Sequence, residues 1–202
     1  MSDHLIIALN REYGSGGKEI AEKLGKRLGL EVYDEDIADL AARRSGIRKD
    51  YFEKVDEKPT DSFLYMLAMN TSMNPFENTL SSDKLFNKQA EVIQEIADKD
   101  DCIIVGRCAG YILRDEPKCV RIYISADKDF RTKRIMASDH LDEKEAQKKI
   151  HSMDKKRDSY FGYYAGQDWK ACHTYDLSIS TSSLGIDKAV DLICQYIDIK
   201  FK

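Results

Sequence analysis

A glycine-rich segment near the N-terminus, residues 11–20, reads Arg-Glu-Tyr-Gly-Ser-Gly-Gly-Lys-Glu-Ile and has the residue types of a phosphate-binding loop. Its glycines allow backbone amides to converge on one anion, and the helix predicted to follow adds about half a positive charge at its N-terminus. Lys18 would add a full charge on a flexible side chain. The segment therefore predicts an anion site formed by Gly14, Ser15, Gly16, Gly17, Lys18 and Glu19.

This loop departs from the strict pattern for its type, which is G-x-x-x-x-G-K-[ST]. With Lys18 as the lysine, the first glycine position holds Glu12 and the hydroxyl position holds Glu19. With the register shifted by one residue, the lysine position holds Gly17. The missing hydroxyl matters because it normally ligates Mg²⁺, and Glu19 is the candidate to hold the metal, directly or through water. The alternative for the whole segment is a glycine-rich turn that binds no ligand.

The elements that must position this loop can be predicted from short apolar runs. These runs indicate strands at residues 5–9, 30–33, 102–105, 120–124 and 177–180, with helical patterns at 20–28, 37–44, 86–97, 142–163 and 186–197 and after Asp127. Strands that alternate with helices predict an α/β sandwich with a mainly parallel sheet. Ligands bind at the carboxyl ends of such strands, so the residues to consider follow them, at 11–18, 34, 106–107, 126–134 and 181–183.

The composition of the 202-residue chain limits the possible classes of protein. Hydrophobic residues make up 42%, which is enough for one core, and no apolar run approaches the ~20 residues of a membrane span. The N-terminus is acidic, which argues against a secretory signal. Five cysteines without C-x-x-C spacing favour reduced thiols over disulfides or a zinc site. We therefore expect a cytoplasmic protein with no membrane partner.

The charge is unevenly distributed along the chain. Residues 127–157 contain ten Lys or Arg and seven Asp or Glu, a balance of +3, whereas the whole chain carries −4 and the remainder therefore −7. A local basic surface on an acidic protein suits a small polyanion such as a nucleotide phosphate better than a long nucleic acid. The alternative is a solvated helical face of mixed charge.

Taken in order, the loop and the later motifs resemble those of the cytidylate kinases, and more closely the cytidylate kinase-like branch, whose loop reads Y-G-S-G-G-[KR]-E-I. The motifs are the loop, Asp34, Gly106-Arg107, Arg131-x-x-Arg134, Arg157-Asp158 and the segment Asp-Leu-Ser-Ile-Ser-Thr-Ser at 176–182. The match runs from residue 5 to about 197 and is least constrained at 45–83.

This resemblance implies a P-loop NTPase fold, an adenylate-kinase-like three-layer α/β/α sandwich with a five-stranded parallel sheet and a helical lid. It implies one domain over residues 1–202, with a core at 1–44 and 84–202, an acceptor-side helical insertion at about 45–83, and a lid at about 138–170. The implied reaction transfers the γ-phosphoryl group of ATP, with Mg²⁺, to CMP or dCMP.

The resemblance also implies roles for individual residues. The catalytic residues would be Lys18, Arg131, Arg134 and Arg157, and the acceptor-binding residues would be Asp34, Arg107 and Asp158. Surface ion pairing is the alternative for Arg107, helix capping for Asp34, and a solvated lid helix for Arg131 and Arg134.

The sequence departs from the family pattern in the residues that would recognise the acceptor. Cys108 stands where the family has Asp, and Phe161 and Tyr164 replace a second Asp and an Arg. The aromatic residues at 160–169 would either stack on a base or pack the lid against the core. The alternative function is a nucleotide-binding module with a different small-molecule acceptor or no transferase activity, and a nucleic-acid-binding protein is a more distant one.

Overall fold

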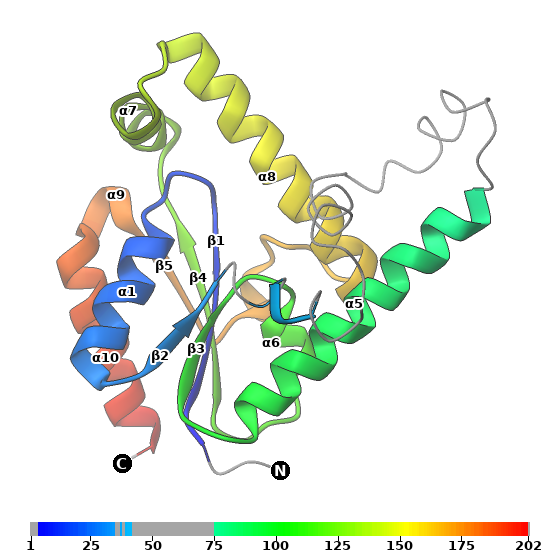
Figure 1. The fold of residues 1–202 in the computed structure, drawn as a ribbon. Helices are drawn as coiled ribbons and strands as arrows, with labels where there is room; N and C mark the ends of the chain where they lie inside the picture. The colour runs from blue at the N-terminus through cyan, green and yellow to red at the C-terminus, as the bar shows by residue number, and fades with distance from the viewer. Residues whose placement is uncertain (1–3, 35–36, 38, 42–74, 202) are drawn as a thin grey trace.

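The computed structural model describes residues 4–34, 37, 39–41 and 75–201, and it is built around one five-stranded parallel sheet (Figure 1). The strand order is β2-β3-β1-β4-β5. The strands are β1 (Ile6–Arg11), β2 (Glu31–Tyr33), β3 (Cys102–Val105), β4 (Cys119–Ser125) and β5 (Leu177–Ser180). β1 lies between β3 and β4, with Ile6 paired to Cys102 on one side and to Cys119 on the other. The loop that follows β1 therefore starts at the centre of the carboxyl edge.

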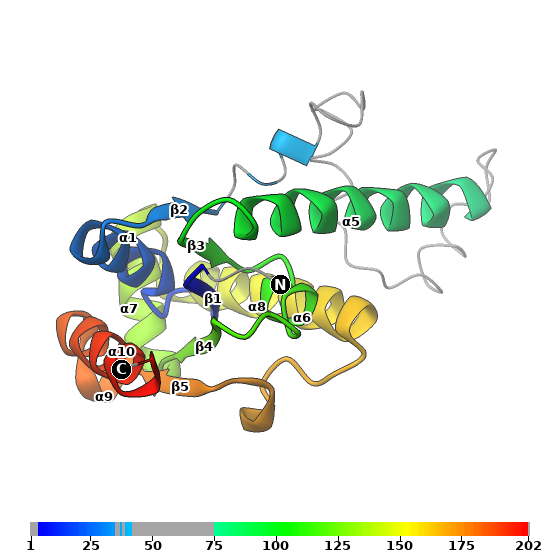
Figure 2. The same cartoon turned by 90° about the horizontal axis from the view of Figure 1, so that it is seen from below.

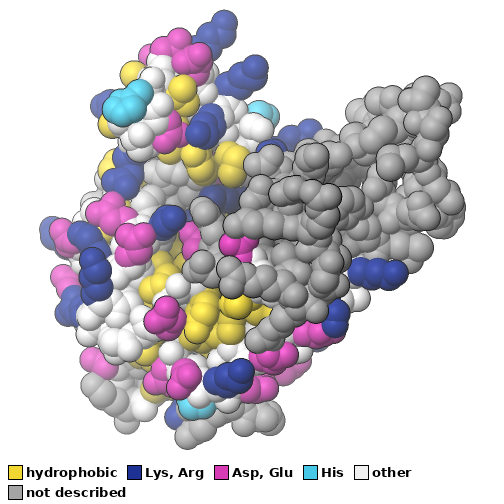
Figure 3. Space-filling model, viewed as in Figure 1, with side chains coloured by type: hydrophobic (Ala, Val, Ile, Leu, Met, Phe, Trp, Pro, Cys, Tyr) yellow, Lys and Arg dark blue, Asp and Glu magenta, His cyan; other side chains and the backbone are white. Residues whose placement is uncertain are grey.

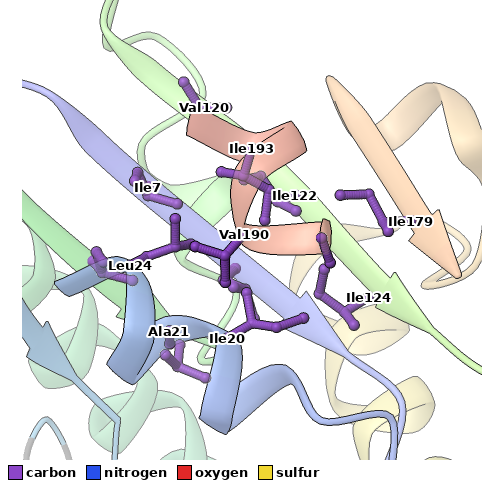
Figure 4. Packing of buried hydrophobic residues seen from close by; sticks show 14 of the residues in the cluster. Ile7, Ile20, Ala21, Leu24, Val120, Ile122, Ile124, Ile179, Val190 and Ile193 are labelled. Carbon is purple, nitrogen blue, oxygen red and sulfur yellow. The ribbon is translucent and has the colours of Figure 1, made fainter. Parts of the chain in front are cut away.

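Helices cover both faces of the sheet, which gives the expected three layers (Figure 2). One face packs against α1 (Gly17–Leu28) and α10 (Ile186–Phe201), and the other against α5 (Pro75–Ala97) and α6 (Ala109–Ile112). Alternate residues of a strand point to opposite faces, so Ile7 joins the α1 and α10 cluster and Ile6 joins the α5 cluster. In Figure 4, side chains of α1 and α10 point onto β1 and β4.

Two helices form a hairpin over the carboxyl edge of the sheet (Figure 1). They are α7 (Lys128–Asp139) and α8 (Glu143–Ala165). The start of α8 is fixed by a capping box, in which the Asp142 carboxylate accepts the Glu145 amide hydrogen and the Glu145 side chain accepts that of Asp142. Short elements complete the fold: the 3₁₀ helix η1 (Cys172–Thr174) and α9 (Thr181–Leu184).

The predicted strands agree with the observed ones to within two residues. A continuous buried apolar run marks β1 and β3, whereas β2 and β5 are only partly buried. The prediction for α5 differs, since this helix begins at Pro75 rather than near Phe86. Proline is well tolerated in the first turn of a helix. The core–insertion boundary expected at residue 84 therefore falls inside a continuous helix. Residues 42–74, which include most of the expected insertion, lie outside the described part of the chain.

Two expectations from the composition can be compared with the described residues. None of the five cysteines, all of which are described, forms a disulfide. Within the described ranges, no helix is both long enough and apolar enough to cross a lipid bilayer.

Candidate active site

The loop between β1 and α1 can only be built with glycine at two of its positions. Gly14 and Gly16 have φ angles of +80° and +86°, in the left-handed region that side chains disfavour. A Cβ at Gly16 would lie 2.2 Å from the Ile186 Cδ1, and one at Gly14 would lie 3.1 Å from the Ile135 Cγ1. Gly16 is the N-cap of α1, so the loop leads directly into the helix N-terminus, where unpaired amides favour an anion.

Hydrogen bonds inside the loop fix its shape. The Ser15 hydroxyl donates to the Glu12 carbonyl oxygen at 2.8 Å, and the Ser15 amide donates to the same oxygen at 3.3 Å. Thr181, at the start of α9, donates its hydroxyl to the Ser15 carbonyl oxygen at 2.7 Å. Ser15 and Thr181 are completely buried, so the serine hydroxyl faces into the protein and serves the loop itself.

Lys18 and Glu19 follow in the first turn of α1. Lys18 is exposed at the second position of the helix. The Glu19 carboxylate accepts a hydrogen bond from Arg134 Nη2 at 2.9 Å and lies 3.5 Å from the Lys23 ammonium. The described residues contain no group of three His, Cys, Asp or Glu side chains that could hold a metal ion. Glu19 is thus engaged by two cations in this arrangement.

α7 brings both of its predicted arginines to the loop. Arg131 is 9% exposed, pairs through Nη1 with Asp154, and also donates to the Tyr13 carbonyl oxygen at 3.4 Å. Arg134 reaches the other side of the loop through its pair with Glu19. The two arginines lie three residues apart on one helix and thus share a face, as the sequence predicts.

Arg157, from α8, also points at the loop. Its Nη1 donates to the Arg11 carbonyl oxygen at 2.9 Å, and its guanidinium carbon lies 5.5 Å from the centre of the Tyr13 ring. Burial lowers the pKa of the Arg157 guanidinium, while the nearby Asp154 and Asp34 carboxylates act in the opposite direction. An arginine remains charged near neutral pH. Three predicted arginines therefore meet around one glycine-rich loop.

Asp34, one of the predicted acceptor-binding residues, is held by Arg11, to which the sequence analysis gave no role. Arg11 Nη2 donates to Asp34 Oδ1 at 3.0 Å, and both side chains are more than four-fifths buried. A Cβ at Gly106 would lie 2.2 Å from the Arg11 Nη1, so this side chain also lies against the end of β3. Arg107 follows with a φ of +53°, an uncommon and strained conformation for a residue with a side chain. Arg11 thus links the carboxyl ends of β1, β2 and β3.

Asp158 is not brought to this group. Its neighbour Arg157 faces the loop, whereas Asp158 is exposed and lines a hollow of about 480 Å³ that Arg131, Asp154 and Lys170 also line. Successive residues of a helix point about 100° apart, which explains the separation.

The aromatic residues at 160–169 pack against the core. The Phe161 and Trp169 side chains are buried with Cys108 and Tyr123 in one cluster. Tyr164 stacks on Phe86 of α5, with the ring centres 3.9 Å apart. Burial raises the pKa of the Cys108 thiol to about 12. The residues that replace the polar acceptor-binding positions of the family pattern are therefore engaged in packing.

The sequence analysis gave no role to several residues of the site: Arg11, Glu12, Tyr13, Asp154 and Lys170. Arg11 ends β1 and the next two follow it, so they fall in the range 11–18 that the sequence marked for consideration. Asp154 lies one helical turn before Arg157 and could have been found from that spacing. Nothing in the sequence distinguishes Lys170 from other exposed lysines.

Comparison with known sequences and structures agrees with this arrangement. The sequence model of the cytidylate kinase-like family matches residues 6–183. A cytidylate kinase of Methanopyrus kandleri is 24% identical over 96% of this chain and 93% of that protein. A cytidylate kinase of Sulfolobus acidocaldarius is 31% identical over 110 residues, which span 54% of this chain and 60% of that protein.

Solved structures show the same fold. A crystal structure of an uncharacterised protein from Eubacterium ventriosum superposes with a TM-score of 0.72 at 30% identity, covering 96% of this chain and 99% of that one. Shikimate kinase from Acinetobacter baumannii superposes with a TM-score of 0.53 at 14% identity, covering 100% of this chain and 97% of that one, which is a likeness of fold. The five-stranded parallel sheet in the order 2-3-1-4-5 is thus an adenylate-kinase-like α/β fold of P-loop kinases. Because the family model matches most of this chain, the chain belongs to the cytidylate kinase-like family.

Proposed function

We propose that this protein transfers the γ-phosphoryl group of ATP to the phosphate of a nucleoside monophosphate, with CMP and dCMP as the first acceptors to test. The observation that carries the proposal is the meeting of Arg131, Arg134 and Arg157 around the glycine-rich loop at the start of α1. Phosphoryl transfer requires in-line positioning and positive charge on the transferred oxygens, and it asks for little covalent chemistry from the protein.

In the proposed reaction, an oxygen of the acceptor phosphate forms a bond to the γ-phosphorus while the bond to the β,γ-bridging oxygen breaks. The bridging oxygen leaves with ADP. The loop amides at Gly14, Gly16 and Gly17 and the Lys18 ammonium would hold the ATP phosphates, and the three arginines would stabilise charge on the group in flight.

Mg²⁺ would supply further charge neutralisation while bound to the ATP phosphates. Because no three-carboxylate cluster exists among the described side chains, we propose that phosphate oxygens and water provide most of its ligands. Glu19 could approach the metal only by leaving its pairs with Arg134 and Lys23.

The acceptor phosphate is proposed to bind at the ends of β2 and β3, where Asp34 pairs with Arg11 and where Gly106, which precedes Arg107, lies against the Arg11 side chain. A guanidinium can hold a phosphate through two hydrogen bonds. Asp158 lies apart from them, in the hollow that Arg131, Asp154 and Lys170 also line. We propose that the lid at 138–170 closes by movement of α7 and the first half of α8, which would exclude water from the transferred group.

The second candidate is a nucleotide-binding module with another small-molecule acceptor or with no transferase activity. The pairing of Arg131 with Asp154 and of Arg134 with Glu19 favours it, because phosphates must compete with both carboxylates.

The two candidates are separated by coupled ADP release with ATP, Mg²⁺ and a panel of nucleoside monophosphates that includes CMP and dCMP. We expect turnover of about 1–100 s⁻¹ on the preferred acceptor. Lys18→Ala and Arg107→Ala should each lower kcat/KM by about 100-fold, as removal of a charged phosphate contact does. Lys26→Ala, which removes an exposed lysine from the last turn of the same helix, is the matched control and should leave kcat/KM unchanged. ATP binding without turnover on any acceptor would support the module instead.

A further inference from the structure

Glu12 is a buried carboxylate within the phosphate loop, at a position where the strict loop pattern has glycine. Only 7% of the residue is exposed. Its Oε2 accepts the amide hydrogen of Ala126 at 3.1 Å, just beyond the end of β4. Its Oε1 accepts a hydrogen bond from the Lys170 ammonium at 2.8 Å, in the segment that follows α8. One side chain therefore joins the loop to two distant parts of the fold.

The same carboxylate lies beside the most buried of the predicted arginines. The Arg131 Nε is 3.7 Å from the Glu12 Oε2 and is buried without a hydrogen-bond partner. The Nη1 of the same guanidinium is held by Asp154. Arg131 is thus fixed between two carboxylates, one on α8 and one in the loop. A buried charge of this kind requires such partners, because water does not stabilise it.

Lys170 is well placed to hold Glu12, because its neighbours anchor the segment. Trp169 is completely buried, and its carbonyl oxygen accepts a hydrogen bond from the Tyr175 hydroxyl at 2.7 Å. The Asp168 carboxylate accepts the Lys170 amide hydrogen at 2.8 Å. The ammonium is therefore presented from a fixed backbone even though half of its side chain is exposed.

We propose that Glu12 is a positioning residue that, braced by Lys170, holds the Arg131 guanidinium over the phosphate loop. The inference rests on the proposed function, since it assigns Arg131 to the transferred phosphoryl group. Preorganised charge lowers the barrier because no reorganisation is needed when charge develops. Glu12 itself touches no reacting atom in this scheme.

Glu12→Gln tests the proposal, because glutamine keeps the volume and can still accept the Ala126 amide hydrogen while the charge is lost. We expect kcat to fall about tenfold, as for a misplaced catalytic group, with the KM for ATP changed less than about twofold. A variant that was merely less stable would lower the active fraction and not the kcat per active site, so active sites are titrated in each preparation.

Variants of Lys170 test the same proposal from the other partner. Lys170→Met should lower kcat as Glu12→Gln does, and Lys170→Arg should keep most of the parent kcat. The Glu12→Gln/Lys170→Met double variant should have the same kcat as Glu12→Gln alone, because the lysine acts through Glu12. Lys133→Met, which removes a lysine from an exposed position of α7, is the matched control and should keep the parent kcat. Additive losses in the double variant, or a parent kcat in Glu12→Gln, would overturn the proposal.

A readout independent of catalysis separates this inference from the proposed function. Trp169 is the only tryptophan of the chain and lies 5.7 Å from the Lys170 ammonium, measured to the ring centre. Acrylamide quenching of its fluorescence should increase about twofold in Glu12→Gln and Lys170→Met, because each variant removes one of the contacts that hold the segment, and stay unchanged in Lys133→Met. If the parent protein turns over no acceptor, the proposed function fails, and quenching alone decides whether Glu12 holds the segment. Unchanged quenching together with unchanged kcat would exclude the positioning role.

Discussion

Several cationic side chains near the phosphate loop each form an ion pair with a carboxylate of the same chain. Arg11 pairs with Asp34, Arg131 with Asp154, and Lys170 with Glu12. Matching of this kind lowers the cost of gathering charge at a partly buried site. It also means that a phosphate must compete for each arginine: it can bind the guanidinium only by displacing the paired carboxylate or by sharing the guanidinium with it.

For the pair between Arg134 and Glu19, this competition can be measured as a change in the Kd for Mg·ATP. The two side chains are 37% and 40% exposed, so the pair is worth about 0.2–1 kcal/mol. If Glu19 competes with phosphate for Arg134, Glu19→Gln should tighten Mg·ATP binding by about two- to fivefold, measured by calorimetry. Glu22→Gln, an exposed carboxylate later in the same helix, is the control and should not change the Kd. Weaker binding that depends on Mg²⁺ would instead give Glu19 a role as metal ligand.

Among the secondary-structure elements, β5 pairs with β4 in the sheet, and one carboxylate reinforces this attachment. Asp176 precedes β5 and accepts hydrogen bonds from the Arg121 amide at 2.8 Å and from its Nε and Nη2, both at 3.1 Å. Burial acts to raise the pKa of Asp176, but the hydrogen bonds from Arg121 outweigh it, so the pKa lies below its ordinary value. The ionised form is therefore the one that the fold stabilises.

Asp176→Asn should lower the free energy of unfolding by about 1–3 kcal/mol at pH 7, as measured by urea denaturation. Because the folded pKa is depressed, this contribution is fully present above the unfolded pKa of about 3.9 and is lost as the pH falls through the folded value. The difference between parent and variant should therefore shrink as the pH falls below about 4. Asp187→Asn, which removes the exposed partner of Lys23, should leave the denaturation curve nearly unchanged. A difference that did not depend on pH would contradict the charge argument.

The elements themselves were predictable to a large extent, and the contacts between them were not. A buried apolar run marks β1, β3 and most of β4, whereas β5 alternates apolar and polar residues, and the glycine-rich turn after β1 predicts an anion site. Glu12 and Lys170 are 158 residues apart, and the spacing of apolar residues in the sequence does not indicate that they pair. The sequence left open a basic surface or a solvated face of mixed charge at 127–157, and Arg131, Arg134 and Lys149 each pair with a carboxylate. Figure 3 shows acidic and basic side chains interleaved over the hairpin of α7 and α8.

For the molecule as a whole, the contact between α8 and α5 bears on which part of the α7 and α8 hairpin can move. The two helices meet near the C-terminal end of α8 (Figures 1 and 2). Phe86 stacks on Tyr164 with the ring planes 5° apart, and the Tyr160 hydroxyl donates to the Gln89 side-chain oxygen at 3.0 Å. The first half of α8 packs against α7, and the middle of α8 contacts the phosphate loop through Asp154. We therefore expect the C-terminal end of α8 to stay in place while α7 and the first half of α8 move in any closing of the hairpin.

A double-mutant cycle tests this expectation. Phe86→Leu and Tyr164→Leu should show a coupling of about 0.5–1.5 kcal/mol in urea denaturation, which is the value of an aromatic pair beyond its burial. Ile199→Ala, on α10 at the opposite face of the sheet, should be additive with Tyr164→Leu, because distant sites do not couple. The coupling should keep the same size when saturating Mg·ATP is present, since a hinge holds in both the open and the closed position. A coupling that disappeared with Mg·ATP would show that the whole of α8 leaves α5, and the lid would then have to pivot at the segment after Ala165 that Trp169 anchors.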